Sequence, residues 1–164
     1  MASRAAPSSN ARSTARSDWL RLDQQLCFAL YAASLAMTKL YKPLLEPLGL
    51  TYPQYLALLV LWQDDGLTVS QLGERLHLDS GTLTPLLKRL EGAGLVQRLR
   101  DAQDERRVRV QLTATGRALK KQAARVPEAV ACASGCALDE LASLTTRLRS
   151  LHGQLSNAPA RVAS

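Results

Sequence analysis

The residue most clearly able to take part in a chemical reaction is Cys27, which lies in the apolar stretch QLCFALYAAS with Tyr31 four residues later. Residues four apart share one face of a helix, so the two side chains are neighbours if this stretch is helical. A cysteine in such a place is often only a small core residue. A stabilised thiolate could instead react with an oxidant. Cys27 is therefore a candidate redox thiol, with a plain core thiol as the alternative.

A thiolate at Cys27 needs donors nearby, because a helix predicted over residues 17–45 places it about ten residues from the helix start. The helix dipole acts only over the first turn, and Asp23, one turn before, would oppose a negative charge. Phenol hydroxyls are the remaining donors. Tyr41 lies ~21 Å further along a straight helix, so it reaches Cys27 only if the helix breaks or a partner subunit supplies it. The sequence favours a sensor site built across a dimer interface. The expected apolar lining is Leu26, Phe28, Leu30 and Trp62.

The charge balance points to a polyanionic partner. Lysine and arginine total 21 against 14 acidic residues, which gives a net charge of +7, and nucleic acid is the first candidate for such a chain. No apolar run reaches the ~18 residues of a membrane span, so no membrane partner is expected. Three scattered cysteines and the absence of a secretory signal predict a reducing cytoplasm.

A metal site is the alternative for the two other cysteines, Cys132 and Cys136. Together with His77 or His152 they could hold zinc, but the segment CASGC lacks the second ligand pair expected of such a site. The sequence therefore predicts neither a metal nor any other cofactor.

The length of 164 residues predicts one domain, residues 18–156. Residues 1–17 are expected to be a disordered basic tail, for which an organellar transit peptide is the alternative, and residues 157–164 a flexible C-terminus. Within the domain, a winged helix-turn-helix is expected over about residues 52–112. Helices for dimerisation are expected on either side, over about residues 18–46 and 113–156.

The central part of the chain carries the signals of a helix-turn-helix. Thr68 and Gln71 form a capping box that opens a short helix after the helix expected over residues 53–63. Leucines then recur with the spacing of an amphipathic helix: Leu83, Leu86, Leu87 and Leu90. Pro85 leaves the start of this second helix open, because a start near Asp79 predicts a kink and a start near Thr82 does not.

A basic hairpin follows this pair of helices. Val108, Val110 and Leu112 alternate with polar residues, which predicts a strand that is apolar on one face and basic on the other. The fold class expected is therefore mainly α with a small β-hairpin wing, a winged helix. Its second helix would enter the major groove of DNA, and a wing arginine the minor groove. The residues expected to contact DNA are Ser80, Thr82, Thr84, Lys88, Arg89, Arg98 and Arg107. Each charge among them has a solvated surface residue as its alternative.

The C-terminal part reads as a helix from Thr113 to Pro127 and a last helix over residues 138–155. Leucines in the last helix are spaced 3, 4, 3 and 4 residues apart, which is a heptad seam: Leu141, Leu144, Leu148, Leu151 and Leu155. The seam could cover the first helix of its own chain or the same helix of a second subunit. Half-sites on DNA are read by twofold-symmetric dimers, which favours a homodimer.

Several segments resemble a known family. The run GLVQRLRDAQDERRVRVQLTATG is similar to the wing of the MarR family of bacterial transcription regulators. QLCFALY, YKPLLEPLGLTYPQYLALLVLWQDDG and LDSGTLTPLLKRLE together resemble its organic-hydroperoxide-sensing branch, the OhrR type, over residues 18–154. The resemblance implies that Cys27 senses peroxide, and that Tyr31, Tyr41 and Tyr52 surround it.

The resemblance also implies a two-cysteine mechanism, in which Cys132 resolves the oxidised Cys27 of the other subunit as a disulfide. Cys136, four residues away, could substitute for Cys132. In the wing, Asp104 and Arg106 match a family pair, with Arg106 as the minor-groove arginine.

The function expected is a redox-sensing repressor and not an enzyme. It would bind a pseudo-palindromic double-stranded operator when reduced, and leave it when organic hydroperoxides oxidise Cys27. The main alternative is a MarR-type repressor induced by a small aromatic or phenolic ligand. A thiol peroxidase and an architectural DNA-binding protein are further alternatives. The winged helix argues against the peroxidase, and a response to inducer would argue against the architectural role.

Overall fold

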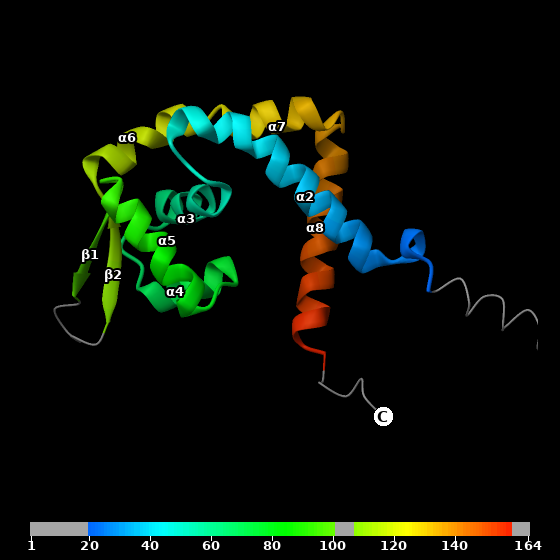
Figure 1. The fold of residues 1–164 in the computed structure, drawn as a ribbon, viewed down its shortest axis with the longest axis horizontal. Helices are drawn as coiled ribbons and strands as arrows, with labels where there is room; N and C mark the ends of the chain where they lie inside the picture. Colours follow the sequence, from blue (N-terminus) through cyan, green and yellow to red (C-terminus); the bar gives the residue numbers. More distant parts are fainter. Residues whose placement is uncertain (1–19, 101–106, 159–164) are drawn as a thin grey trace, which may run out of the picture. The chain divides into compact units, whose positions relative to one another are not determined.

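The computed structural model describes residues 20–100 and 107–158, which fall into two units divided between Leu40 and Tyr41 (Figure 1). A 3-10 helix, η1 (Leu22–Gln24), precedes the long helix α2 (Leu26–Leu45), which belongs to the first unit up to Leu40 and to the second unit from Tyr41 on. The expected helix start near residue 17 is therefore wrong for the described residues. Gln25 has extended φ and ψ values of −86° and 115°, so it separates η1 from α2. Cys27 consequently lies in the first turn of α2.

In the second unit a short 3-10 helix, η2 (Glu46–Leu48), is followed by the core helix α3 (Tyr52–Gln63). Thr51 and Gln54 form a capping box at the start of α3, and Pro53 lies in its first turn, where a missing N–H costs little. Helix α4 (Val69–Leu76) begins at the predicted capping box of Thr68 and Gln71. The buried side chains of these helices include Leu58, Leu61 and Leu72.

Helix α5 (Ser80–Gly92) is the second helix of the helix-turn-helix. Asp79 is its N-cap, which settles the open question of its start in favour of the earlier position. The helix continues through Pro85, whose ring nitrogen cannot donate to the carbonyl of Gly81. Leu83, Leu87 and Leu90 are buried as the periodicity predicts. The turn between α4 and α5 passes close to Gly73, where a Cβ would lie 2.8 Å from the carbonyl oxygen of Leu78 and 3.5 Å from the side chain of Leu83 on α5.

The wing is an antiparallel hairpin of β1 (Val96–Arg100) and β2 (Val108–Leu112). Val96 pairs with Leu112 and Arg98 with Val110. Val110 and Leu112 are buried while Arg107 and Arg109 are exposed, so the predicted alternation is confirmed. The hairpin packs against α4, α5 and α6 through these apolar side chains.

Three helices follow the wing: α6 (Ala114–Ala123), α7 (Val126–Ser134) and α8 (Leu138–Ser156). The single helix expected from Thr113 to Pro127 is wrong, because it ends at Ala123 and Pro127 lies in the first turn of α7. A proline in the first turn starts a helix as readily as it ends one. Cys132 therefore lies on α7. The last helix confirms its predicted bounds to within one residue.

Helix α8 buries none of its side chains. In its heptad seam Leu144 is 49% exposed, Leu148 39% and Leu155 63%. The seam is thus an uncovered apolar stripe in the chain as described.

Within the described ranges no single helix has the length and hydropathy to cross a membrane. The segments Leu26–Leu48 and Tyr52–Gln63 meet both criteria only when they are taken together as a bent pair. Helix α3 in this pair is a core helix of the second unit, with five buried residues.

Candidate functional site

Asp79 caps and stabilises the start of α5. Its carboxylate accepts the backbone N–H of Thr82 at 2.9 Å and the hydroxyl of Thr82 at 2.9 Å. These bonds, the backbone N–H first, hold the pKa of Asp79 below its usual value. The hydroxyl of Thr84 donates to the carbonyl of Ser80 at 2.7 Å. The predicted DNA contacts Thr82 and Thr84 therefore use their hydroxyl hydrogens within the helix, and their oxygens remain as acceptors.

Lys88 and Arg89 are exposed on the side of α5 opposite its buried leucines. Their position fits a helix that lies in a groove with cations at its flank. Arg98 differs from them. Its Nη2 lies 2.6 Å from the Glu91 carboxylate at the end of α5, and its backbone N–H donates to the same carboxylate at 3.1 Å. The Arg98 side chain beside Glu91 holds the pKa of Glu91 below its usual value. Arg98 thus joins the wing to the recognition helix.

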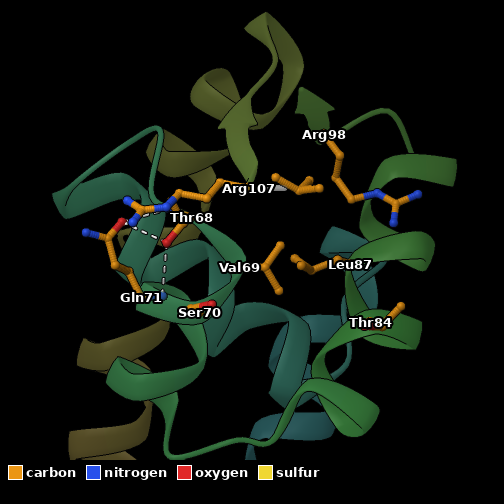
Figure 2. A pocket seen from close by; sticks show the side chains of 9 residues that line it. Thr68, Val69, Ser70, Gln71, Thr84, Leu87, Arg98 and Arg107 are labelled. Carbon is orange, nitrogen blue, oxygen red and sulfur yellow. Dashed lines mark hydrogen bonds between the residues drawn. The ribbon is translucent and has the colours of Figure 1, made fainter. Parts of the chain in front are cut away.

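A hollow of about 570 Å³ lies between α4, α5 and the wing (Figure 2). Arg98 on β1 and Arg107, just before β2, line it from the wing, while Ser70 comes from α4 and Thr84 from α5. The remaining lining residues are Thr68, Val69, Gln71, Leu87 and Val108. Two predicted DNA-binding arginines and Thr84 therefore surround one hollow. Asp104 and Arg106, the other predicted wing residues, lie outside the described residues.

The base of the wing is fixed by Asp65. One oxygen of its carboxylate accepts the backbone N–H of Leu112 at 2.8 Å, and the other lies 2.5 Å from the guanidinium of Arg117. The neighbouring loop adds two further bonds to β2. Val110 donates to the carbonyl of Leu67 at 2.8 Å, and Arg109 to that of Gly66 at 3.0 Å. Sequence reasoning missed this role, because the segment DDG gives only the signal of a helix end.

Trp62 connects α3 to α6 through two hydrogen bonds. Its indole N–H donates to the carbonyl of Gly116 at 2.9 Å, and its own carbonyl accepts from Lys120 at 2.9 Å. A glycine is required at position 116, because a Cβ there would overlap the carbonyl of Leu95. Trp62 was expected to line a peroxide pocket. In the second unit it lines a small cavity of about 190 Å³ together with Tyr55, Lys120 and Pro127.

Cys27 is exposed in the first turn of α2, and Tyr31 on the same helix is 61% exposed. Leu26 and Phe28 are exposed as well, so the first unit presents an apolar face around the thiol. The placement in the first turn corrects the expectation that Cys27 lies deep in its helix.

Three tyrosines gather in the second unit. The ring centroid of Tyr41 lies 4.6 Å from that of Tyr52 and 5.9 Å from that of Tyr55. Burial, with Tyr52 beside it, raises the pKa of the Tyr41 hydroxyl. Burial, with Tyr41 next, raises the pKa of Tyr55. Both hydroxyls therefore stay protonated at neutral pH and can donate hydrogen bonds. Tyr41 and Tyr52 were predicted to act together, whereas Tyr55, three residues after Tyr52 on α3, was missed.

The other two cysteines, Cys132 and Cys136, are both exposed. They line one groove of about 580 Å³ at the end of α7, together with Glu128 and Leu138. Among the residues described, no three histidine, cysteine or acidic side chains are placed together as metal ligands would be.

Comparison with known proteins places these features in context. The profile of the MarR family matches residues 50–108. The chain is 52% identical over 139 residues to the organic hydroperoxide resistance transcriptional regulator of Bacillus subtilis (strain 168). The matched region covers 82% of this chain and 95% of that protein.

Among solved structures, the fold is similar to that of AbfR of Staphylococcus epidermidis. Reduced AbfR bound to DNA has a TM-score of 0.70 at 37% identity, over 87% of this chain and 99% of that one. Disulfide-formed AbfR has a TM-score of 0.59 at 38% identity, over 85% of this chain and 98% of that one.

These matches confirm the predicted fold class, a mainly helical chain with a hairpin wing. They also exclude the peroxidase alternative, since the relatives are regulators that share the whole arrangement of helices and wing. With 52% identity to a regulator that it spans almost completely, the chain belongs to the MarR family of DNA-binding transcription regulators and is not an enzyme.

Proposed function

We propose that the chain is a redox-sensing repressor, which binds operator DNA when reduced and leaves it when an organic hydroperoxide oxidises Cys27. The observation that carries this proposal is the 52% identity to the B. subtilis organic hydroperoxide resistance regulator over 95% of that protein. The AbfR structures support it, because that relative has been solved both reduced on DNA and in a disulfide form.

The first chemical step takes place at the sulfur of Cys27. The thiolate attacks one oxygen of the hydroperoxide, the O–O bond breaks, and the products are a Cys27 sulfenic acid and an alcohol after proton uptake. An exposed thiol in the first turn of α2 supports this role, because the peroxide can reach it. The exposed apolar face around it suits an organic peroxide better than hydrogen peroxide.

In the second step the Cys132 thiol of the other subunit condenses with the sulfenic acid, forms a disulfide and releases water. Tyr41 and Tyr52 would complete the site as hydroxyl donors across the same interface, with Tyr31 from the helix of Cys27. A disulfide requires a Cα–Cα separation of about 4.4–6.8 Å, so its formation constrains how the two subunits lie. Two recognition helices displaced from successive half-sites lose affinity for DNA.

The homodimer is part of the proposal. The exposed seam of α8 supports it, because five leucines on one helix face are an expensive surface to leave in water. Residues Lys88, Arg89 and Arg107, with the hollow between α5 and the wing, are the proposed contacts to operator phosphates and bases.

The test uses a duplex selected by the reduced protein from random sequence, with binding followed by fluorescence anisotropy. Near-stoichiometric cumene hydroperoxide should release the wild type, and dithiothreitol should restore binding. Cys27→Ser should stay bound throughout, while Cys132→Ser should form no covalent dimer and should release less DNA than the wild type. If wild type and Cys27→Ser both stay bound, Cys27 is not the sensor.

A ligand-induced repressor is the second candidate, favoured by the cavity between Tyr55, Trp62 and Lys120. A cation beside two aromatic rings suits an aromatic acid. The cavity holds only about 190 Å³, however, below the ~300 Å³ of ordinary ligand pockets. Release of DNA by benzoate, with no effect of Cys27→Ser, would favour this candidate over the redox one.

A further inference from the structure

The proposed function uses two of the three cysteines and leaves Cys136 without a role. Cys136 is exposed and lines the same groove as Cys132, between Pro127 on α7 and Leu138 at the start of α8. Both thiols therefore open onto one solvent-filled space. Cys136 therefore shares the groove onto which any bond made by Cys132 also opens.

The turn between the two cysteines brings the chain back on itself. The backbone N–H of Gly135 donates to the carbonyl of Cys132 at 3.4 Å, and Gly135 has a positive φ of 68°. The thiol of Cys136 lies 3.6 Å from the carbonyl of Ser134, so its sulfur is directed back toward the end of α7. The same Ser134 accepts the backbone N–H of Cys136 at 3.3 Å. Cys136 is thus held against the last turn of the helix that carries Cys132.

We propose that Cys136 is a relay thiol that removes the disulfide from the sensing cysteine. This inference rests on the proposed function. The Cys136 thiolate attacks the Cys132 sulfur of the disulfide with Cys27 of the other subunit. The bond between Cys132 and Cys136 forms, the intersubunit bond breaks, and Cys27 leaves as a thiolate. Two sulfurs are oxidised before and after the step, so no further oxidant is needed.

The geometry favours this exchange. Cys136 lies two residues beyond the end of α7, so a turn at Gly135, and not a helix, joins it to Cys132. A disulfide requires the two Cβ atoms to come within about 3.5–4.5 Å of each other, and a turn centred on a glycine can adjust to this distance without moving a side chain. A thiol held in the same turn also acts at an effective concentration of the order of mM, above that of a dilute external thiol.

The relay would change how the repressor reads an oxidant. The first hydroperoxide at each subunit would release DNA only until the exchange is complete. Cys27 would then be reduced again and the subunits no longer cross-linked, with the oxidising equivalent stored between Cys132 and Cys136. Binding would then return slowly without any external reductant, and added dithiothreitol would only speed its return.

The experiment uses full-length protein, one molar equivalent of cumene hydroperoxide per subunit, and N-ethylmaleimide to trap free thiols over time. Trypsin cuts after Arg125 and Arg147 and releases Cys132 and Cys136 in one peptide, residues 126–147. This peptide loses two hydrogens when the relay disulfide forms. The intersubunit disulfide instead joins it to residues 22–39, which contain Cys27.

In the wild type the covalent dimer on a non-reducing gel should rise and then fall, as the peptide lighter by two hydrogens appears. In Cys136→Ser the dimer should persist at least tenfold longer, and DNA binding should not return without dithiothreitol. Ala133→Ser, an exposed change on the same turn, is the matched control and should behave like the wild type.

Two failures are distinguishable. A dimer that persists equally in the wild type and in Cys136→Ser overturns the relay and leaves the proposed function intact. A Cys136→Ser protein that forms no covalent dimer at all overturns the intersubunit disulfide, and the relay with it.

Discussion

Arg98 in the wing and Glu91 at the end of α5 form a two-point contact, in which the guanidinium and the backbone N–H of Arg98 both bind the Glu91 carboxylate, at 2.6 and 3.1 Å. The contact joins the two elements that would enter adjacent grooves of DNA. Arg98 was expected to contact DNA, but in this structure its side chain binds Glu91 and so helps to hold the wing against α5.

The pH dependence of this contact follows from its charge. The pKa of Glu91 is held below its ordinary value of 4.5, so the contact stabilises the fold above this value and is lost as the pH falls through the lower, folded-state pKa. Glu91→Gln should lower the free energy of unfolding at about pH 6, and the difference from wild type should shrink toward about pH 3. Urea unfolding at several pH values measures it. Glu74→Gln, exposed on α4, is the control, and a difference that does not change with pH would contradict the prediction.

The close approach at Gly116 predicts a large loss of stability. Gly116→Ala places a Cβ against the carbonyl of Leu95, so the backbone of α6 must move away from the wing, at a cost of about 3 kcal/mol. Gly92→Ala is the matched control, because a Cβ there meets nothing within 4 Å, and it should change stability by no more than about 0.5 kcal/mol. Chemical denaturation measures the free energy of unfolding of both variants. Equal values would contradict the prediction, because they would mean that α6 and Leu95 move apart without loss of stability.

The exposed seam of α8 predicts the oligomeric state. Leu148→Asp introduces a charge in the middle of the stripe and should convert a dimer into monomers, as measured by sedimentation velocity. Ser143→Asp, exposed on the same helix, should leave the dimer intact. A Leu148→Asp protein that remains dimeric would place the subunit interface elsewhere.

The cations on α5 predict a salt dependence. Lys88→Ala should weaken binding to all DNA sequences alike and reduce the slope of log K against log salt by about 1. Lys121→Ala on α6 removes the same charge away from α5 and the wing and should leave the slope unchanged. An unchanged slope in Lys88→Ala would show that Lys88 is only a solvated charge.

The tyrosine cluster predicts the reactivity of Cys27. Tyr41→Phe keeps the ring contact with Tyr52 but removes a hydroxyl donor, and the loss of one hydrogen bond to a charged group should slow the reaction with cumene hydroperoxide about tenfold. Stopped-flow measurement of thiol loss gives the rate, with Tyr55→Phe as the control. Equal rates in all three proteins would remove Tyr41 from the sensor site.

The sequence was a good guide where a local rule decides the structure. The capping box at Thr68, the leucines of α5 and the alternation of β2 each follow from a pattern within about ten residues. The start of α2 was misjudged because Leu22, Leu26 and Leu30 keep a helical spacing across Gln25, whose extended backbone does not show in that pattern. Pro127 was interpreted as the end of a helix, although proline is equally suited to the first turn of a helix and lies there in α7.

The site was less predictable than the fold, because its contacts join distant segments. Arg98 and Glu91 lie seven residues apart, on a strand and a helix, and Asp65 reaches Leu112 across 47 residues. No periodicity encodes such pairs. The resemblance grouped Tyr31, Tyr41 and Tyr52, and only the fold shows that Tyr55 lies beside Tyr41.

The bonds from Asp65 to the wing and from Trp62 to α6 have a consequence for sequence preference. Together with the bonds from Arg98 to Glu91, they fix the wing, α5 and α6 to one another. A change at the subunit contact would therefore move the winged helix-turn-helix as one body, without altering the surface that meets the bases. Oxidation should then weaken binding to a full palindrome while the ranking of half-site sequences stays the same. In this protein the oxidant would determine whether two half-sites are read together, and the choice of bases would be independent of redox state.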